Sequence, residues 1–534
     1  MMGKLNSTRN SSIGLLLCLL LASCCNTRDN SSGQSNKKRI VVQTIIENKL
    51  LVDSTEIGLS TIISNLEVPW EIAWGQDNWI WFTEQRGRIS KVNPATGERK
   101  ILLNIADVWH ERTAGLLGMA LHPDMKKFPY VVVDYTYRQD TTILSRLVRY
   151  TSINDTLINP VLLLEIPGNT AHNGSRVTIG PDGKIFWATG DAVHSERAQD
   201  TKSLNGKILR LNIDGSIPKD NPIEKSAVWA FGYRNIQGLV YAANGILYTS
   251  EHGDATDDEV NLIRKGGNYG WPDVTGFYDT PAEQAYNRKK TIAEPLKAWT
   301  PTIAPAGIAY YGSDAIPEWH NSLLLTTLKA QSLRVLQLDK AGKTILSERV
   351  FFNKVLGRLR SVCVSPDGDV YIATSNRDWN PPKDFPKASD DRIVRVFSIK
   401  PGDKLSPAYV NLQQHTDSLS TPGEEIASGG QLIYNQYCSS CHKQDGNGIA
   451  GTFPPLRAAK QAVGNKQELI HILLNGLSGP IKVNGQKYNQ QMPAFHFLSD
   501  TEIAEVLTYV RSAFDNQATP ITANEVKSER KANQ

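Results

Sequence analysis

The chain has 534 residues, which exceeds one ordinary domain, and 40% of them are hydrophobic, enough to bury a large core. Its 58 lysines and arginines nearly balance its 54 aspartates and glutamates, leaving a formal net charge of +4. A surface that binds nucleic acid needs a strong basic bias. No nucleic-acid partner is therefore expected.

The N-terminus has the pattern of an export signal. Basic residues precede an apolar run, residues 13–22, which is too short for an ordinary membrane span. The run leads into Leu-Ala-Ser-Cys24, which resembles a bacterial lipobox. The resemblance implies that residues 1–24 are a lipoprotein signal with its lipobox cysteine, and that Cys24 becomes the lipidated first residue; a plain secretory signal is the alternative. We expect an exported, membrane-anchored lipoprotein, in the periplasm or on the cell surface.

Three polar stretches separate or end the predicted domains. Residues 25–60 begin with a Ser/Asn/Gly-rich segment and are predicted to form a tether, and residues 401–422 are predicted to form a linker. Residues 516–534 are predicted to form a polar tail. These stretches leave two candidate domains, residues 61–400 and 423–515.

A repeated unit fills the first candidate domain. Each copy has an apolar position, a tight turn and a short apolar strand, and the six copies are residues 74–83, 122–133, 179–189, 243–250, 318–326 and 364–374. The Asp-Gly and Asn-Gly pairs in the turns favour type I′ hairpins. Six similar hairpins predict a closed six-bladed β-propeller, with a β-sandwich as the alternative. The chain is therefore predicted to be mostly β.

Three longer motifs indicate which family of propeller proteins this domain resembles. Residues 206–222, 232–239 and 266–272 together resemble the soluble quinoprotein glucose/aldose (sorbosone-type) dehydrogenase family, and the likeness covers about residues 60–400. That family uses pyrroloquinoline quinone (PQQ). The resemblance implies that the chain is an oxidoreductase acting on CH–OH donors.

The resemblance also implies roles for single residues. His172 matches the family's catalytic base, and the pKa of a free histidine suits that task. PQQ carries three carboxylates and needs fixed cations, and guanidinium groups suit carboxylates. The positions that match the family's cofactor-binding residues are Arg234, Asn235, Lys329, Arg358 and Arg360.

Calcium is the metal that the resemblance implies. Residues 251–259 are rich in hard oxygen ligands but do not match the EF-hand pattern. The backbone carbonyls of Gly253 and Asp254 match the positions that hold the calcium next to the quinone. The positions that match a second, structural calcium are Asp258, Glu259 and Tyr269.

Two positions near the expected substrate site, and a third in the calcium loop, depart from the glucose enzyme of the family. Ala171 stands where that enzyme has an acidic residue before the catalytic histidine, and Thr113 stands where it has a glutamine of the sugar pocket. Asp254 also replaces a proline of the calcium loop. These departures argue that glucose itself is not the preferred substrate.

The second candidate domain contains Cys438-Ser-Ser-Cys441-His442, a CxxCH motif typical of covalent c-type haem. The thiols can form thioethers, and His442 can bind the iron. A structural zinc site would need four ligands, and no second pair follows at a suitable spacing. A redox CxxC motif would need no histidine at this place.

The expected second iron ligand is Met492, since no other methionine is available to a C-terminal domain and a His/Met pair suits an electron acceptor. His471 and His496 are the fallback ligands, and a core methionine is the alternative interpretation. Residues 423–514 resemble class I cytochrome c over their whole length, which predicts a small all-α domain with one covalent haem. Ser499 and Glu502 predict a capping box for its last helix.

Together these patterns predict a PQQ-dependent dehydrogenase that oxidises a sugar (aldose), or a related alcohol or aldehyde, and reduces its own haem. The haem would then pass electrons to another cytochrome or a terminal oxidase. Two alternatives remain. One is a calcium-dependent propeller hydrolase or lactonase without quinone, and the other is a non-enzymatic binding propeller that carries an electron-shuttle cytochrome.

Overall fold

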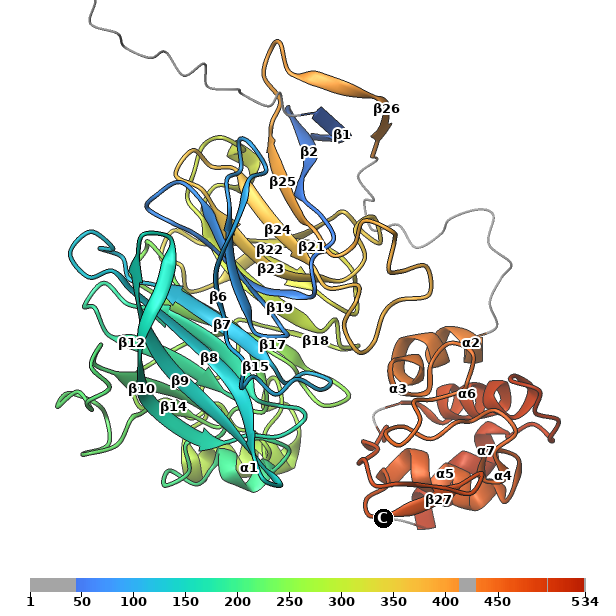
Figure 1. The fold of residues 1–534 in the computed structure, drawn as a ribbon. Coiled ribbons are helices and arrows are strands. Elements are labelled where there is room, and N and C mark those ends of the chain that lie inside the picture. Colours follow the sequence, from blue (N-terminus) through green and yellow to red (C-terminus); the bar gives the residue numbers. More distant parts are fainter. Residues whose placement is uncertain (1–44, 413–428, 497, 533–534) are drawn as a thin grey trace, which may run out of the picture. The chain divides into compact units, whose positions relative to one another are not determined.

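The structure is a computed structural model that describes residues 45–412, 429–496 and 498–532 (Figure 1). The predicted signal peptide and Cys24 lie outside these residues. Within the described ranges, no helix is long and apolar enough to cross a membrane. The N-terminal β domain and the C-terminal helical domain are considered separately below.

The β domain is built from five four-stranded antiparallel sheets and one larger sheet, in which four antiparallel strands form the sixth blade of the propeller. Blade one contains β3 (Pro69–Trp74), β4 (Ile80–Glu84), β5 (Arg88–Val92) and β6 (Arg99–Asn104). Blade two contains β7 (Leu116–Leu121), β8 (Tyr130–Gln139), β9 (Thr142–Ile153) and β10 (Thr156–Pro167). Blade three contains β11 (Gly174–Ile179), β12 (Ile185–Thr189), β13 (Lys207–Leu211) and β14 (Val228–Phe231).

The remaining blades follow the same order. Blade four contains β15 (Ile236–Tyr241), β16 (Leu247–Glu251), β17 (Asp258–Leu262) and β18 (Lys297–Trp299). Blade five contains β19 (Pro305–Tyr311), β20 (Ser322–Thr327), β21 (Leu333–Leu338) and β22 (Ile345–Phe351). Blade six contains β23 (Leu359–Val364), β24 (Val370–Thr374), β25 (Ile393–Ser398) and, from the start of the chain, β2 (Thr55–Ile63).

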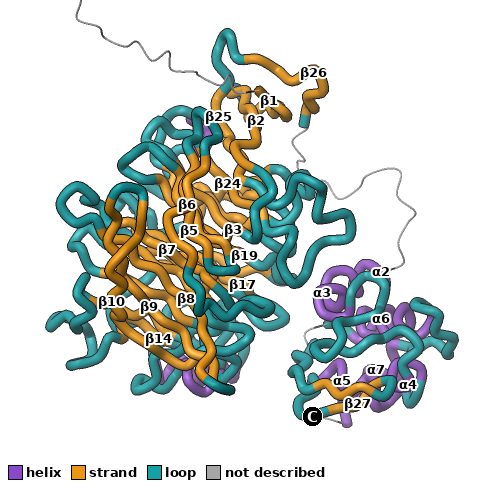
Figure 2. The backbone as a smooth tube through the Cα atoms, viewed as in Figure 1, coloured by secondary structure: helices purple, strands orange, loops and turns teal. Residues whose placement is uncertain are grey.

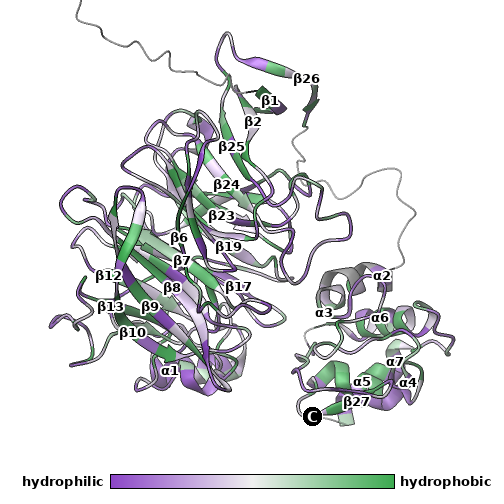
Figure 3. Ribbon diagram, in the orientation of Figure 1, coloured by the Kyte–Doolittle hydropathy of each residue, from purple (hydrophilic) through white to green (hydrophobic). Residues whose placement is uncertain are grey.

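The ring is closed, which confirms the predicted propeller. The innermost strands contact one another in the order β3, β7, β11, β15, β19, β23 and back to β3. Each predicted hairpin is the junction between the first two strands of a blade (Figure 2). Hydrophobic residues lie mainly along these strands, and polar residues occupy many of the connecting loops (Figure 3). This arrangement buries apolar faces between neighbouring blades and leaves the loops free to carry chemistry.

The prediction of type I′ turns is wrong. Gly183, Gly245 and Gly368 are left-handed, with φ of 73°, 83° and 85°, but the residue before each is not. In two of these turns, that residue accepts a side-chain hydrogen bond from the backbone two positions on: Lys184 N–H to Asp182 Oδ1 at 3.1 Å, and Ile246 N–H to Asn244 Oδ1 at 3.1 Å. The aspartate or asparagine shapes the turn through its side chain, so only the glycine needs a positive φ.

Regular structure extends beyond the predicted propeller strands. β1 (Ile45–Val52) lies in the predicted tether, pairs with β2 and also pairs in parallel with β26 (Lys404–Asn411) from the predicted linker. Helix α1 (Pro281–Lys290) interrupts blade four and begins with a Thr280/Glu283 capping box. It buries none of its residues, so it lacks the apolar periodicity by which a helix is predicted.

The C-terminal domain is mainly helical, as predicted. Its helices are α2 (Gly429–Ile433), a π-helical turn (Tyr434–Cys438), α3 (Ser439–His442), α4 (Lys460–Val463), α5 (Lys466–Asn475), α6 (Asp500–Ser512) and α7 (Ala523–Ala532). A hairpin of β27 (Ile481–Val483) and β28 (Gln486–Tyr488) is its one departure from an all-α description among the described residues. The predicted Ser499/Glu502 capping box is present at the start of α6.

The core of this domain is set by a close helix crossing. A side-chain Cβ at Gly430 of α2 would collide with the carbonyl oxygen of Glu505 in α6, so glycine allows the two helices to approach. Helix α7 contacts α5 and α6 and buries Val526 completely. A helix was not predicted here, because residues 516–534 look polar as a whole.

Candidate active site and haem site

His172 lies in the loop before β11 and has a left-handed backbone, with φ of 55°. Its carbonyl oxygen accepts a 2.9 Å hydrogen bond from Ala192 N–H. Gly190 makes this approach possible, since a Cβ there would collide with the His172 carbonyl. A non-glycine residue in this conformation costs conformational energy that the surrounding loop must offset, which is common at functional sites.

The imidazole of His172 is held by a buried carboxylate. Its Nδ1 lies 2.9 Å from Asp191 Oδ1, and Asp191 also accepts hydrogen bonds from Val193 N–H at 2.8 Å and Trp271 Nε1–H at 2.9 Å. An ionised carboxylate can only accept, so Nδ1 carries the proton and Nε2 keeps its lone pair. Burial, and secondly Arg234, lower the pKa of His172 below its usual value. The hydrogen bond to Asp191 and its negative charge act in the opposite direction and raise it. The ring is therefore neutral near pH 7.

A second histidine, His252, also lies near Arg234. Burial, followed by Arg234 and Arg360, lowers the pKa of His252 to about 3. Its Nε2 is buried and has no hydrogen-bond partner within the described parts of the chain. With so low a pKa, His252 cannot hold a proton near neutral pH, so His172 is the better base of the two.

Arg358 and Arg360 point the same way, as their alternation predicts. Arg358 Nη2 and Arg360 Nη2 each lie 2.8 Å from Asp378 Oδ2, and Asp378 is buried. Two guanidinium groups thus share one carboxylate, which leaves an excess positive charge in a buried place. Burial lowers the pKa of Arg360 to about 10, which still leaves it charged.

Of the other predicted cofactor residues, Asn235 joins this cluster through hydrogen bonds, while Lys329 and Arg234 bond to other neighbours. Asn235 Oδ1 accepts from Gly174 N–H at 3.2 Å and from Gln237 Nε2–H at 3.1 Å, and Gln237 Oε1 faces Arg360 Nη1 at 3.4 Å. Lys329 Nζ donates to the Thr302 hydroxyl at 2.9 Å. Arg234 forms a 2.9 Å ion pair with Asp254, and its guanidinium carbon lies 5.4 Å from the centroid of the Trp271 ring.

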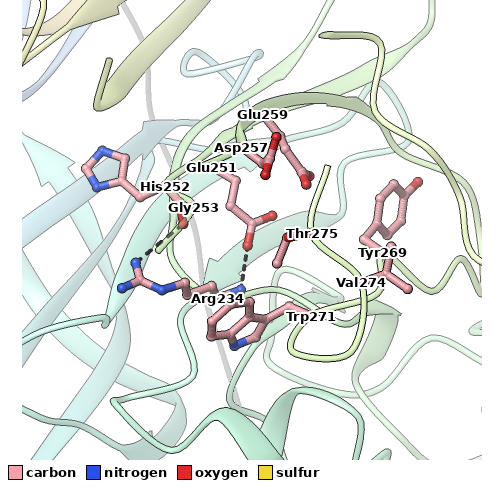
Figure 4. Close-up of a pocket in the computed structure, with 10 residues that line it drawn as sticks. All are labelled: Arg234, Glu251, His252, Gly253, Asp257, Glu259, Tyr269, Trp271, Val274 and Thr275. Carbon is pink, nitrogen blue, oxygen red and sulfur yellow. Dashed lines mark hydrogen bonds between the residues drawn. The ribbon is translucent and has the colours of Figure 1, made fainter. Parts of the chain in front are cut away.

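An acidic pocket lies beside Arg234 (Figure 4). Its lining residues are Arg234, Glu251, His252, Gly253, Asp257, Glu259, Tyr269, Trp271, Val274 and Thr275. Figure 4 shows the carboxyl groups of Glu251, Asp257 and Glu259 gathered on one side of the Arg234 side chain. Burial, and then the neighbouring Glu259, raise the pKa of Glu251 well above its ordinary value, and burial raises that of Glu259 to about 7. The two buried carboxylates repel each other unless a cation or a proton lies between them.

The structure brings only some of the predicted metal positions together. Gly253, Glu259 and Tyr269 line the pocket, whereas Asp258 does not. Asp258 instead accepts backbone hydrogen bonds from Gly253 at 2.8 Å and from Ile303 and Ala304 at 2.6 Å each. Within the described ranges, no three His, Cys, Asp or Glu side chains are placed to hold one metal ion.

Thr113 and Ala171, which depart from the glucose enzyme near the expected substrate site, lie together. The Thr113 hydroxyl donates to the Thr170 carbonyl at 3.2 Å, and Thr113 N–H donates to the same oxygen at 3.3 Å. Ala171, the next residue, is buried and directly precedes His172. Thr113 thus bonds to the backbone two residues before His172, and Ala171 directly precedes it.

In the helical domain, the CxxCH residues span the π-helical turn and α3. Cys438 and Cys441 form no disulfide among the described residues, and burial raises the pKa of Cys438 to about 12. His442 is buried, and its Nδ1 lies 2.8 Å from the Pro454 carbonyl oxygen. A carbonyl can only accept, so Nδ1 carries the proton and Nε2 is available to a metal. Met492 and Cys438 pack against the same hydrophobic core, and the backbones of Met492 and Leu477 bond to each other.

Two parts of the chain match known protein families. Residues 66–380 match the family described as Glucose / Sorbosone dehydrogenase, and residues 427–514 match Cytochrome c. The chain belongs to the glucose/sorbosone dehydrogenase family. This glucose/sorbosone dehydrogenase family member therefore carries a C-terminal cytochrome c domain, and the predicted pairing of the two is confirmed.

Three relatives show how far each likeness extends. Quinoprotein glucose dehydrogenase B of Acinetobacter calcoaceticus is 34% identical over 446 residues, covering 67% of this chain and 92% of that protein. The solved PQQ-bound aldose sugar dehydrogenase of Streptomyces coelicolor is 30% identical, with a TM-score of 0.56, over 64% of this chain and 98% of that one. Cytochrome c-552 of Thermus thermophilus is 43% identical over 107 residues, covering 18% of this chain and 81% of that protein.

The sequence patterns missed the partners of the predicted residues. Asp191 and Asp378 hold His172 and Arg360 but stand outside the quoted motifs, and Gln237, which bonds to Asn235, lies inside the motif 232–239 without having been singled out. Asp191 directly follows the third repeated hairpin, and that position was the one signal that could have marked it.

Proposed function

We propose that this chain is a PQQ-dependent dehydrogenase that oxidises a sugar (aldose), or a related alcohol or aldehyde, and passes the electrons to its own c-type haem. The observation that carries the proposal is the neutral, carboxylate-held His172 in the same propeller loops as a buried cluster with excess positive charge. The names of the relatives from Acinetobacter and Streptomyces, and the cytochrome c domain, support it.

PQQ fits the charge of this cluster. It has three carboxylates, and Arg358 and Arg360 have only Asp378 between them, while Lys329 donates to a neutral hydroxyl. We assign Arg234, Asn235, Lys329, Arg358 and Arg360 to holding it. When bound, PQQ supplies a two-electron acceptor for hydride from the substrate carbon.

His172 is assigned the role of general base. Its Nε2 takes the proton of the substrate hydroxyl, because Nδ1 is already protonated and bound to Asp191. The imidazolium that forms is stabilised by the Asp191 carboxylate 2.9 Å away. The side chain of His172 remains 21% exposed, so the proton can pass on to solvent. Thr113 and Ala171, which lie beside this loop in sequence or through a hydrogen bond, are proposed to influence the choice of substrate.

Calcium is proposed for the acidic pocket. Glu251 and Glu259 are two buried carboxylates in need of a cation, and the pocket also contains Gly253 and the Tyr269 side chain. Calcium accepts carboxylate, carbonyl and water oxygens together, so three carboxylates are not required. A bound Ca²⁺ would act as a Lewis acid toward a quinone carbonyl at the Gly253–Asp254 end. Asp258 is assigned to the backbone around Ile303 rather than to the metal.

Calcium should stabilise the folded chain through Glu259. At about 100 times Kd, a ligand that binds only the folded state adds about 2.7 kcal/mol to the free energy of unfolding. Glu259→Gln should lose this response, and in excess chelator it should unfold at a higher temperature than the wild type, because one of two repelling carboxylates is gone. Thermal unfolding with calcium and with chelator measures both effects.

Glu84→Gln is the matched control for the calcium experiment. Glu84 is equally buried but pairs with Arg88 and Arg99, so its loss should destabilise the chain and leave the calcium response intact. If Glu259→Gln kept the full calcium response, the ion would have to be placed elsewhere.

One covalent haem per chain is proposed for the C-terminal domain. Cys438 and Cys441 would form the thioethers, His442 would bind iron through Nε2, and Met492 would bind from the other side. When bound, the haem supplies a one-electron acceptor, so each turnover needs two transfers.

The two alternative functions, a hydrolase and a binding propeller, account for fewer of the buried charged residues. A hydrolase without quinone, or a binding propeller without chemistry, would leave the buried pair of Arg358 and Arg360, and Lys329, without a use. The test is to load the full-length chain with PQQ and calcium and to screen sugars and alcohols anaerobically for reduction of the haem. Reduction by an aldose or a related alcohol supports the proposal, and hydrolysis of a lactone without haem reduction would replace it.

We also propose that the chain is an exported lipoprotein anchored through Cys24, in the periplasm or at the cell surface. The apolar run and lipobox-like sequence before Cys24 support the anchor. Another cytochrome or a terminal oxidase would then take electrons from the haem.

A further inference from the structure

Arg176 of β11 spans the central channel of the propeller. It follows His172 by four residues, but its side chain is buried, with 2% of its surface exposed. Its Nε donates to the Gln237 carbonyl in blade four at 2.6 Å, its Nη1 to the Trp70 carbonyl in blade one at 3.2 Å, and its Nη2 to the Arg360 carbonyl in blade six at 3.0 Å. One guanidinium thus joins blade three to three other blades.

The charge of Arg176 is balanced inside the channel. Arg176 Nη1 lies 2.6 Å from Glu71 Oε2, and the Ser361 hydroxyl donates to Glu71 Oε1 at 2.7 Å. Ser361 directly follows Arg360 on β23. The ion pair with Glu71 means that Arg176 is not a further free cation for an anionic ligand.

The three carbonyls that Arg176 binds are all connected to Arg360. Trp70 places its ring centroid 3.9 Å from the guanidinium carbon of Arg360, and Gln237 faces Arg360 Nη1 with its side-chain oxygen at 3.4 Å. The third carbonyl belongs to Arg360 itself. Every backbone group that Arg176 holds therefore belongs to Arg360 or to a residue whose side chain contacts the Arg360 guanidinium.

We infer that Arg176 is a positioning residue for the quinone-binding Arg360. Blades are held to one another mainly by side-chain packing, which leaves their innermost strands able to shift slightly. The planar fork of a guanidinium fixes the directions of its donors and so fixes the three carbonyls relative to one another. The inference rests on the proposed role of Arg360 in holding PQQ.

Arg176→Met should weaken the binding of PQQ to the intact, haem-containing, calcium-loaded chain by roughly ten- to a hundredfold, the range for a displaced charge-assisted hydrogen bond. Binding is measured by the quenching of tryptophan fluorescence as PQQ is added. At saturating PQQ, the rate of haem reduction by substrate should recover, because His172 and Asp191 are untouched. Arg176→Lys should lose less affinity, since an ammonium can still bond some of the carbonyls.

Arg210→Met is the matched control. Arg210 is also buried and paired, with Asp182 at 2.7 Å and Asp220 at 2.9 Å, but it contacts none of the residues around Arg360. Both variants should unfold at a lower temperature, while Arg210→Met should change the Kd for PQQ by less than about threefold. Equal losses of PQQ affinity in the two variants would overturn the inference, because they would show a general effect of lost stability.

A double-mutant cycle decides whether Arg176 acts through Arg360. Adding Arg176→Met to Arg360→Ala should weaken PQQ binding little further, whereas independent effects would multiply. Multiplying effects would overturn the inference. If Arg360→Ala alone left PQQ binding unchanged, the proposed cofactor role of Arg360 would fail instead. Should Arg176→Met not fold, Arg176→Lys in the same cycle gives the same decision.

Discussion

His172→Gln should slow the reduction of haem by substrate about a hundred- to ten-thousandfold, the usual cost of removing a general base. Glutamine keeps the polarity of the site but cannot take a proton. Ascorbate should still reduce the haem, since its ligands belong to another domain, and PQQ should still bind through Arg234, Lys329, Arg358 and Arg360. A single-turnover measurement with PQQ-loaded protein isolates the chemical step.

The pH dependence of the wild-type rate gives a second measure of the same base. His172 must be neutral to act, and burial lowers its pKa below the usual histidine value. The rate should therefore be level at neutral and alkaline pH and fall as the solution is acidified through the pKa. His194→Gln is the control, because the imidazole of His194 is half exposed and pairs with Glu196. A His172→Gln variant as fast as this control would place the base elsewhere.

Met492→Ala should keep the haem attached but change its iron ligation. Thioethers to Cys438 and Cys441 do not depend on Met492, so acid–acetone extraction should leave the haem on the protein. The sulfur-to-iron band of the oxidised spectrum should disappear. The potential should fall by a sizeable part of the roughly 0.8 V that axial ligands span.

His496→Ala and His471→Ala are the controls for the iron ligand, because these histidines are the fallback candidates. Each should retain the sulfur-to-iron band and the potential of the wild type. A Met492→Ala variant with an unchanged spectrum, beside a His496→Ala variant that loses its low-spin spectrum, would transfer the ligand role to His496. Release of haem from the wild type by acid–acetone would argue against thioether attachment.

The propeller was predictable from sequence because its signals are local and repeated. Each hairpin carries its own turn residues and apolar strand within a dozen positions, and six copies leave few other architectures. β1 and β26 were missed because they pair with each other from opposite ends of the domain, and each looks polar or isolated when read alone. α1 was missed because it buries no residues.

The site residues also divide into those that the sequence could predict and those that it could not. His172 and the cationic residues stand in recognisable motifs, whereas Asp191, Gln237 and Asp378 gain their meaning only from the fold. Asp258 shows the reverse case. It matches a metal position in sequence, but the chain folds so that its carboxylate caps the backbone of Ile303 and Ala304. Spacing in sequence cannot show which way a buried carboxylate turns.

The central claim is that electrons pass from the propeller to the haem of the same chain. It is tested most directly by mixing the full-length, PQQ-loaded protein with an oxidisable sugar in the absence of oxygen and following haem absorbance at several protein concentrations. With saturating substrate, the first-order rate constant for haem reduction should stay the same at every dilution. A rate constant that rises in proportion to protein concentration, or oxidation of substrate while the haem stays oxidised, would contradict transfer within one chain.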